Sequence, residues 1–301
     1  MRFWGNAMGS RAFAKASAAC AVLGVASLGL ATLGFAGSAR AETYGYAEPG
    51  QMGFQPPVTE IARYIEWFHN DFLLPMTAAI SLFVLALLIY VVFRFNEKAN
   101  PTPSKTTHNT AIEIAWTIIP IILLVVMAMP SFRLLTKELE IPPADLTIKV
   151  TGIQWNWEYS YPQDKDQSGF TFDSYMKSDK ELGKDDIRLL SVDNEAVVPI
   201  GKVVKLVVTA KDVIHSFTVS SFGIRIDAVP GRLNETWFKA EREGVYYGQC
   251  SKICGKDHAF MPITVRAVSE QAFTTWLEEA KKKFASAGGS TAVATANIPA
   301  E

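Results

Sequence analysis

The chain has 301 residues, 49% of them hydrophobic, and its 29 lysines and arginines nearly balance 30 aspartates and glutamates, leaving a net charge of −1. A chain without a strong positive field offers nothing to attract nucleic acid, so we expect no nucleic-acid partner. The length accommodates a targeting segment, a membrane part and one or two compact domains.

Residues 1–41 have the pattern of a secretory signal peptide. They contain a basic start, an apolar core over 18–35 and a small-x-small cleavage site at Ala39-Arg40-Ala41. The alternative is a third membrane helix, but the many alanines and glycines and the cleavage site argue against it. Cys20 falls inside this segment, so the mature chain should retain only Cys250 and Cys254.

Residues 42–70 are predicted to form a periplasmic lead-in, irregular to about 60 and then rich in aromatic residues that suit a membrane interface. A transmembrane hairpin is predicted over 71–135. Its apolar runs, 73–95 and 111–132, each reach the roughly 20 residues that a helix needs to cross a bilayer. The connection between them carries more lysine and arginine than glutamate, which places it in the cytoplasm and the C-terminal part on the export side.

From residue 142 the sequence changes to short runs of alternating apolar and polar residues, separated by glycine and proline. This pattern predicts an all-β Greek-key sandwich over 142–266. Over 267–301 we expect a helix that Ser269 caps and that ends near residue 285, followed by a disordered tail rich in small residues.

A short stretch, 249–261, contains Cys250, Cys254, His258 and Met261. Thiolate, imidazole and thioether are ligands that suit copper, and the distant His215 offers another. Two cysteines four residues apart in an exported domain more often form a disulfide. The combination of all these ligand types nevertheless favours a copper site. The second cysteine indicates a dinuclear one, because two thiolates can bridge two metal ions.

The stretch 249–261 resembles the binuclear copper (CuA) loop of cytochrome c oxidase subunit II. The resemblance extends to His215, to 227–232 (DAVPGR) and to 154–157 (QWNW). It implies a cupredoxin-like domain in the periplasm of a bacterium, attached to the inner membrane. The resemblance also implies the ligands of two copper ions. The thiolates of Cys250 and Cys254 would bridge the ions, and the imidazoles of His215 and His258 would each bind one. The Met261 thioether would be a weak axial ligand, and Lys252 would contribute its main-chain carbonyl.

The resemblance also implies the reaction. Such a domain accepts electrons from cytochrome c and passes them to haem in oxidase subunit I, where oxygen is reduced to water and protons are pumped. Trp155 matches the aromatic residue through which electrons enter. Trp155 and Trp157 should point to one face of a strand and Asn156 to the other, although a core position for at least one tryptophan is the ordinary alternative.

Asp173, Asp193 and Asp212 match the acids with which the family docks cytochrome c. Between Glu158 and Glu195 there are ten acids and five bases, which would attract a basic protein. A solvated surface is the simpler explanation of such a charge run.

Two further positions concern protons and a second metal. Glu113 matches a glutamate at the entrance of a proton channel, although Thr110-x-x-Glu113 also reads as a helix capping box. Position 252 is usually glutamate in the family and binds a magnesium ion between subunits I and II. Lys252 cannot bind that cation, so the site should be lost or weakened, unless magnesium is bound without this chain or a water completes its shell.

Two other functions fit parts of the pattern. A copper-free quinol oxidase subunit II would share the hairpin and the sandwich but should lack the ligands. A periplasmic copper-transfer protein would need exchangeable ligands and would have no need for two membrane helices or for Trp155.

Overall fold

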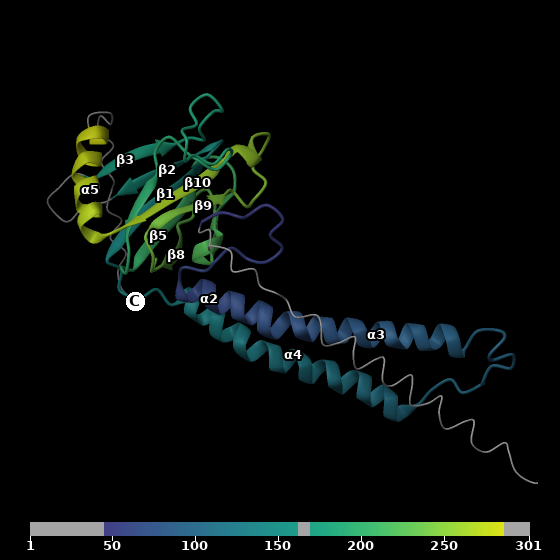
Figure 1. Ribbon diagram of the computed structural model, residues 1–301. Helices are drawn as coiled ribbons and strands as arrows, with labels where there is room; N and C mark the ends of the chain where they lie inside the picture. The colour runs from purple at the N-terminus through teal and green to yellow at the C-terminus, as the bar shows by residue number, and fades with distance from the viewer. Residues whose placement is uncertain (1–44, 162–168, 286–301) are drawn as a thin grey trace, which may run out of the picture. The chain divides into compact units, whose positions relative to one another are not determined.

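A computed structural model describes residues 45–161 and 169–285. The predicted signal peptide and the predicted tail after 285 lie outside the described residues. The chain forms a hairpin of long apolar helices and an all-β domain, which confirms the predicted fold class (Figure 1). The helices are α2 (Glu60–Trp67), the π-helical η1 (Phe68–Leu73), α3 (Leu74–Arg94), α4 (Thr110–Leu139) and α5 (Glu270–Ala285), with 3₁₀ turns η2 (Ser220–Phe222) and η3 (His258–Phe260).

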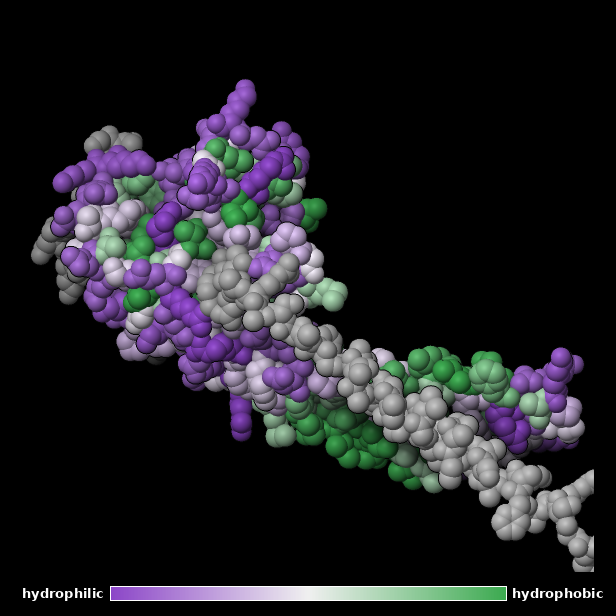
Figure 2. Space-filling model, in the orientation of Figure 1, coloured by the Kyte–Doolittle hydropathy of each residue, from purple (hydrophilic) through white to green (hydrophobic). Residues whose placement is uncertain are grey.

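The hairpin exposes its apolar side chains along its length (Figure 2). Elements α2, η1 and α3 make one continuous helix of 35 residues, and α4 has 30, so both exceed the roughly 20 residues required to span a bilayer. The first helix begins at Glu60 because the Thr59 hydroxyl accepts a hydrogen bond from the Ala62 amide at 3.0 Å and caps it. The aromatic residues after Ile61 are therefore the first turns of this helix.

The N-terminus of α4 differs from the predicted capping box. Asn109, and not Thr110, is the N-cap, and its side chain accepts from the Ile112 amide at 3.2 Å. Glu113 reaches back to accept from the Asn109 amide at 3.1 Å. Asparagine is a stronger N-cap than threonine, so the capping interaction begins at Asn109, one residue before the predicted Thr110.

The β domain is built from three sheets. One has the order β3-β2-β1-β5-β8, the second β4-β10-β9 and the third β6-β7, with β1/β5 and β4/β10 as parallel pairs. The strands are β1 (Leu146–Ile153), β2 (Asn156–Tyr161), β3 (Phe170–Ser174), β4 (Ala196–Pro199), β5 (Val204–Ala210), β6 (His215–Val219), β7 (Ile224–Ala228), β8 (Asn234–Phe238), β9 (Gly244–Gln249) and β10 (Pro262–Val268).

One core fills the space between the sheets. Alternate side chains of β3 and β5 are buried, as expected where one face of a sheet covers a core. Helix α5 lies against β3 (Figure 1), where Phe284 stacks on Phe172 with ring centroids 4.7 Å apart. Trp157 and Phe217, both fully buried, meet edge to face beneath the first residue of β6.

The start of the membrane helix is tied to the same domain. The Val58 amide donates to the Ser221 carbonyl at 3.0 Å, and the Thr59 hydroxyl donates to the Phe222 carbonyl at 2.8 Å. Gly223 has φ +70° and approaches Ala62 so closely that a Cβ there would lie 2.9 Å from its backbone. These contacts hold η2, which directly follows β6.

Candidate metal centre

The predicted ligands come from two segments of the β domain. His215 is the first residue of β6, and the others lie in the loop between β9 and β10. Pairing of Gln249 with Pro262 closes this loop, and the Cys250 amide donates to the Met261 carbonyl at 3.0 Å. The Ser251 amide donates to the Ser216 carbonyl, also at 3.0 Å, which fixes the loop to β6.

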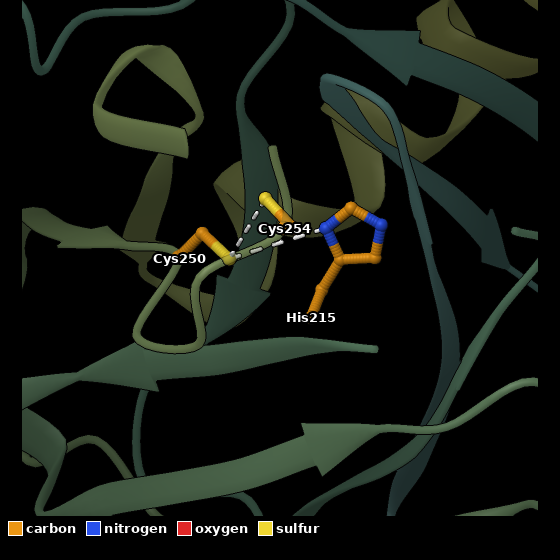
Figure 3. A group of neighbouring side chains, drawn as sticks. All are labelled: His215, Cys250 and Cys254. Carbon is orange, nitrogen blue, oxygen red and sulfur yellow. Dashed lines mark hydrogen bonds between the residues drawn. The ribbon is translucent and has the colours of Figure 1, made fainter. Parts of the chain in front are cut away.

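The side chains converge at the start of this loop (Figure 3). Cys250 Sγ lies 3.8 Å from Cys254 Sγ and 4.0 Å from His215 Nδ1. The ligand atoms of these three buried residues all lie within 4.8 Å of one another. Cys254 Sγ is 3.6 Å from His258 Nδ1, and the Cys250 thiol donates to the Lys252 carbonyl at 3.3 Å. The Met261 side chain is buried in the core that includes both cysteines.

The sulfur separation fits metal ligation. A disulfide would bring the two atoms to about 2.05 Å. Two thiolates about 2.3 Å from one tetrahedral ion lie about 3.8 Å apart, which is the separation of Cys250 Sγ and Cys254 Sγ. Thiolates with imidazoles and a nearby thioether suit copper, whereas magnesium or calcium prefers oxygen ligands. The residues present therefore fit copper.

The metal-free pair of cysteines is electrostatically asymmetric. Burial opposes ionisation of Cys250, but hydrogen bonds with His215 and with the Lys252 and Ser216 backbone lower the pKa of its thiol to about 6. Burial and the adjacent Cys250 charge raise the pKa of Cys254 to about 12. Cys250 is therefore the more readily ionised of the two, and any proton still held by either thiol is lost when metal binds.

Asp212 positions the histidine ligand. His215 Nε2 lies 2.9 Å from Asp212 Oδ1, which leaves Nδ1 directed at Cys250. Burial lowers the pKa of the His215 ring, but its bonds with Cys250 and Asp212 outweigh this and raise it. A carboxylate on the far nitrogen of a metal-binding histidine fixes the orientation of the ring and increases its basicity.

Gln154 connects Asp212 to the cysteine loop. Its amide donates to Asp212 Oδ2 at 2.7 Å, and its side-chain Nε2 donates to the Cys254 carbonyl at 2.8 Å. The sequence had indicated only a docking role for Asp212. The position of Asp212 three residues before His215 was the available signal, but the contact to Gln154 spans 58 residues.

The two tryptophans do not share one strand face. Trp155 lies in the turn between β1 and β2, because β2 begins at Asn156, and the alternation predicted for a strand does not apply there. Trp157 is fully buried in the core, whereas Trp155 is half-buried against the cysteine loop, where a Cβ on Gly255 would lie 2.8 Å from its ring. Asn156 is buried and donates to Asp173 at 2.8 Å.

The remaining predicted residues lie outside the ligand cluster. Asp173 and Asp193 are exposed on the β domain. Glu113 lies at the start of α4, in the hairpin. The Lys252 ammonium extends away from its own carbonyl to Asp227 Oδ2 of β7, at 3.4 Å. A carboxylate of this chain therefore serves as the partner of the Lys252 ammonium.

Gly152 gives a first test of the site. A Cβ at this residue of β1 would lie 2.9 Å from Cγ and Cδ2 of His215, whose side chain is fully buried and cannot move aside. We expect Gly152→Ala to displace the imidazole, to lower the stability of the domain by about 1–3 kcal/mol and to weaken copper binding. Thermal unfolding with and without copper checks this; an unchanged copper spectrum would contradict it. Gly53→Ala is a control for the loss of a glycine, because no atom lies within 4 Å of the added Cβ and the backbone there is not left-handed.

The sequence matches two families. Residues 47–134 match the transmembrane domain, and residues 146–268 match the periplasmic domain, of cytochrome c oxidase subunit II. A probable cytochrome c oxidase subunit 2 of Rickettsia bellii is 52% identical over 249 residues, covering 83% of this chain and 90% of the relative. Cytochrome c oxidase subunit 2 of Cereibacter sphaeroides is 46% identical over 258 residues, covering 80% of this chain and 84% of the relative.

Among solved structures, the periplasmic domain of subunit II of the cytochrome oxidase of Bradyrhizobium japonicum is 58% identical, with a TM-score of 0.44, covering 48% of this chain and 99% of that one. The two family matches account for both the hairpin and the β domain, and they place the β domain in the periplasm and the hairpin in the inner membrane. The chain therefore belongs to the cytochrome c oxidase subunit II family, whose members are parts of a membrane-bound oxidoreductase, and the predicted resemblance is confirmed.

Proposed function

We propose that this chain is the electron-entry subunit of its oxidase. It accepts single electrons from cytochrome c at a dinuclear copper centre and passes them to haem in subunit I, where oxygen is reduced to water and protons are pumped. The observation that supports this most directly is the convergence of His215, Cys250 and Cys254 within 4.8 Å, with His258 beside Cys254.

In this proposal two copper ions would be held by the thiolates of Cys250 and Cys254, shared between them, and by the imidazoles of His215 and His258, one for each. The Met261 thioether would be a further, weak ligand, and Lys252 would contribute its carbonyl. Two copper ions held in this way supply a one-electron carrier.

The chain's own contribution is rigidity. Main-chain bonds tie the loop to β6, and Asp212 orients His215, so the ligands change little between redox states.

We assign electron entry to Trp155. Its ring packs on Gly255, and the side chain of the preceding Gln154 is bonded to the carbonyl of Cys254. A short covalent and hydrogen-bonded route therefore connects the turn that carries Trp155 to one of the bridging thiolates.

Docking of a basic donor is assigned to Asp173 and Asp193, with Asp212 contributing charge besides orienting His215. Several other acids of the surrounding charge run are already paired with bases, among them Glu158 with Lys211, Asp179 with Arg188, Asp186 with Lys177 and Glu195 with Arg266. We expect Asp193→Asn to weaken association at low ionic strength, and this effect to fade as salt shortens the Debye length to about 8 Å. If turnover with cytochrome c did not depend on salt, the assignment of docking to these acids would be wrong.

Glu113 is proposed as the entrance of a proton channel in subunit I. Its carboxylate caps the first turn of α4, which leaves one oxygen for other partners. The capping role alone also accounts for this residue.

Electron spin resonance of the purified protein with copper tests the proposal. One unpaired electron shared equally by two copper nuclei gives seven hyperfine lines, whereas a mononuclear site gives four and a disulfide gives none. Seven lines exclude a copper-free quinol oxidase subunit, and copper that resists a chelator excludes a copper-transfer protein.

The Lys252–Asp227 ion pair supports loss of the magnesium site between subunits I and II. An ammonium offers only donors, and it also neutralises the nearby carboxylate of Asp227. We expect oxidase purified from cells grown in manganese to lack a tightly bound manganese ion. Lys252→Glu should create or tighten that site and leave the copper spectrum nearly unchanged. Stoichiometric manganese that survives chelator in the wild-type oxidase would contradict this.

A further inference from the structure

The surroundings of Trp155 contain charges of both signs. Lys256 Nζ lies 5.6 Å from the centroid of the indole ring, within the range of a cation–π contact. The Lys256 side chain is 78% exposed, so a donor approaching the ring meets a solvated ammonium. Its partner within this chain is Asp257, at 3.7 Å. Lys256 lies in the cysteine loop and plays no part in the proposed copper ligation.

Carboxylates flank the same turn from its backbone side. The Gln154 amide donates to Asp212, and the Asn156 side chain donates to Asp173, so each chain neighbour of Trp155 binds an acid. These hydrogen bonds, at 2.7 and 2.8 Å, hold the two carboxylates in place. The turn is therefore negative at its base, and the indole ring carries a positive charge over its face.

We propose that Lys256 makes the electron-entry surface bipolar and thereby sets the rotational orientation of the docked donor. The inference rests on the proposed function and identifies the kind of donor surface that fits. A matching donor presents lysines to Asp212 and Asp173, and an edge of carbonyl or carboxylate groups, without lysine, to Lys256. A like charge at that edge is repelled, so misoriented complexes are rejected.

The test compares Lys256→Glu, Lys256→Gln and Lys256→Arg in the intact oxidase, with a soluble c-type cytochrome of high isoelectric point as donor. Two observables are needed: the KM for the cytochrome, and the first-order rate of copper reduction at saturating cytochrome. At low ionic strength we expect the KM to fall about two- to threefold in the glutamine variant and about fivefold in the glutamate variant. The reason is that the basic donor can then also bind in orientations that place its lysines at residue 256, where one or two units of repelling charge have been removed.

The first-order rate of copper reduction in the bound complex should fall, although the donor binds more tightly. In Lys256→Glu the surface attracts the donor in many orientations, so we expect copper reduction to slow about threefold or more at low salt and to recover as salt weakens the attraction. Lys256→Arg keeps the cation and should behave as wild type. A KM that stays constant or rises, or a KM that falls with an unchanged rate of copper reduction, would overturn the proposal.

Lys239→Glu supplies a matched control. Lys239 is exposed, and it lines a cavity beside the start of α2 with Thr59 and Trp237. The same change of net charge there should leave both observables as in wild type, and an equal effect at both lysines would overturn the assignment to Lys256. If the wild-type oxidase took no electrons from any cytochrome c, the proposed function itself would fail. Normal electron entry with silent Lys256 variants would refute only the bipolar surface.

Discussion

Replacing either cysteine by serine should abolish the dinuclear centre. A serine hydroxyl does not ionise readily enough to bridge two soft metal ions, and both thiols are buried within 4.8 Å of the His215 ligand atom, where no other thiol is described. We expect Cys250→Ser and Cys254→Ser each to lose the seven-line spectrum and nearly all turnover with cytochrome c. Metal analysis and electron spin resonance of the purified oxidase measure both effects.

A change at Met261 separates bridging from axial ligation. Met261→Leu keeps an apolar side chain of similar volume in a fully buried position, so the domain should fold with little loss of stability. Copper should remain, with an altered spectrum and reduction potential, because only the proposed axial ligand is removed, and a thioether in that position binds weakly. A Cys254→Ser protein that retained two coppers and normal oxidase activity would refute the bridging roles.

The architecture was predictable because it depends on patterns that are local in sequence. Two long apolar runs can satisfy their backbone hydrogen bonds in a bilayer only as helices, and alternating runs such as β5 bury one face. The start of the first helix was harder to predict from the sequence. Thr59 caps it through contacts that also reach Phe222, and no local pattern reveals a contact across 163 residues.

The candidate metal ligands could be selected by their chemistry and order, but the contacts that support them could not be predicted. Asp212 was assigned to docking because it matches a docking acid of the family, whereas its bond to His215 depends on how β6 begins. Trp155 was placed on a strand because Trp-x-Trp alternates, and the structure puts it in a turn. The partner of Lys252 could not be predicted either, because Asp227 is 25 residues earlier in the chain.

Removing the Trp155 ring should slow electron entry strongly and change donor affinity little. The ring packs on Gly255, whose φ of +132° and close approach leave no space for a side chain that could replace the contact. Trp155→Ala therefore removes the group between the donor and the cysteine loop. We expect the first-order rate of copper reduction to fall by roughly two orders of magnitude, the scale on which a displaced reacting group affects an enzyme.

The distinction between rate and affinity makes this prediction specific. Asp173 and Asp193, the proposed docking acids, remain in Trp155→Ala, so the KM for cytochrome c should stay within about twofold of wild type. Trp155→Phe is the matched control, since it keeps an aromatic ring against Gly255 and should retain most of the rate. An unchanged copper spectrum would show that the metal centre itself is intact in both variants. If Trp155→Ala raised the KM and left the rate of the bound complex intact, the residue would belong to docking, and electrons would enter through another part of the cysteine loop.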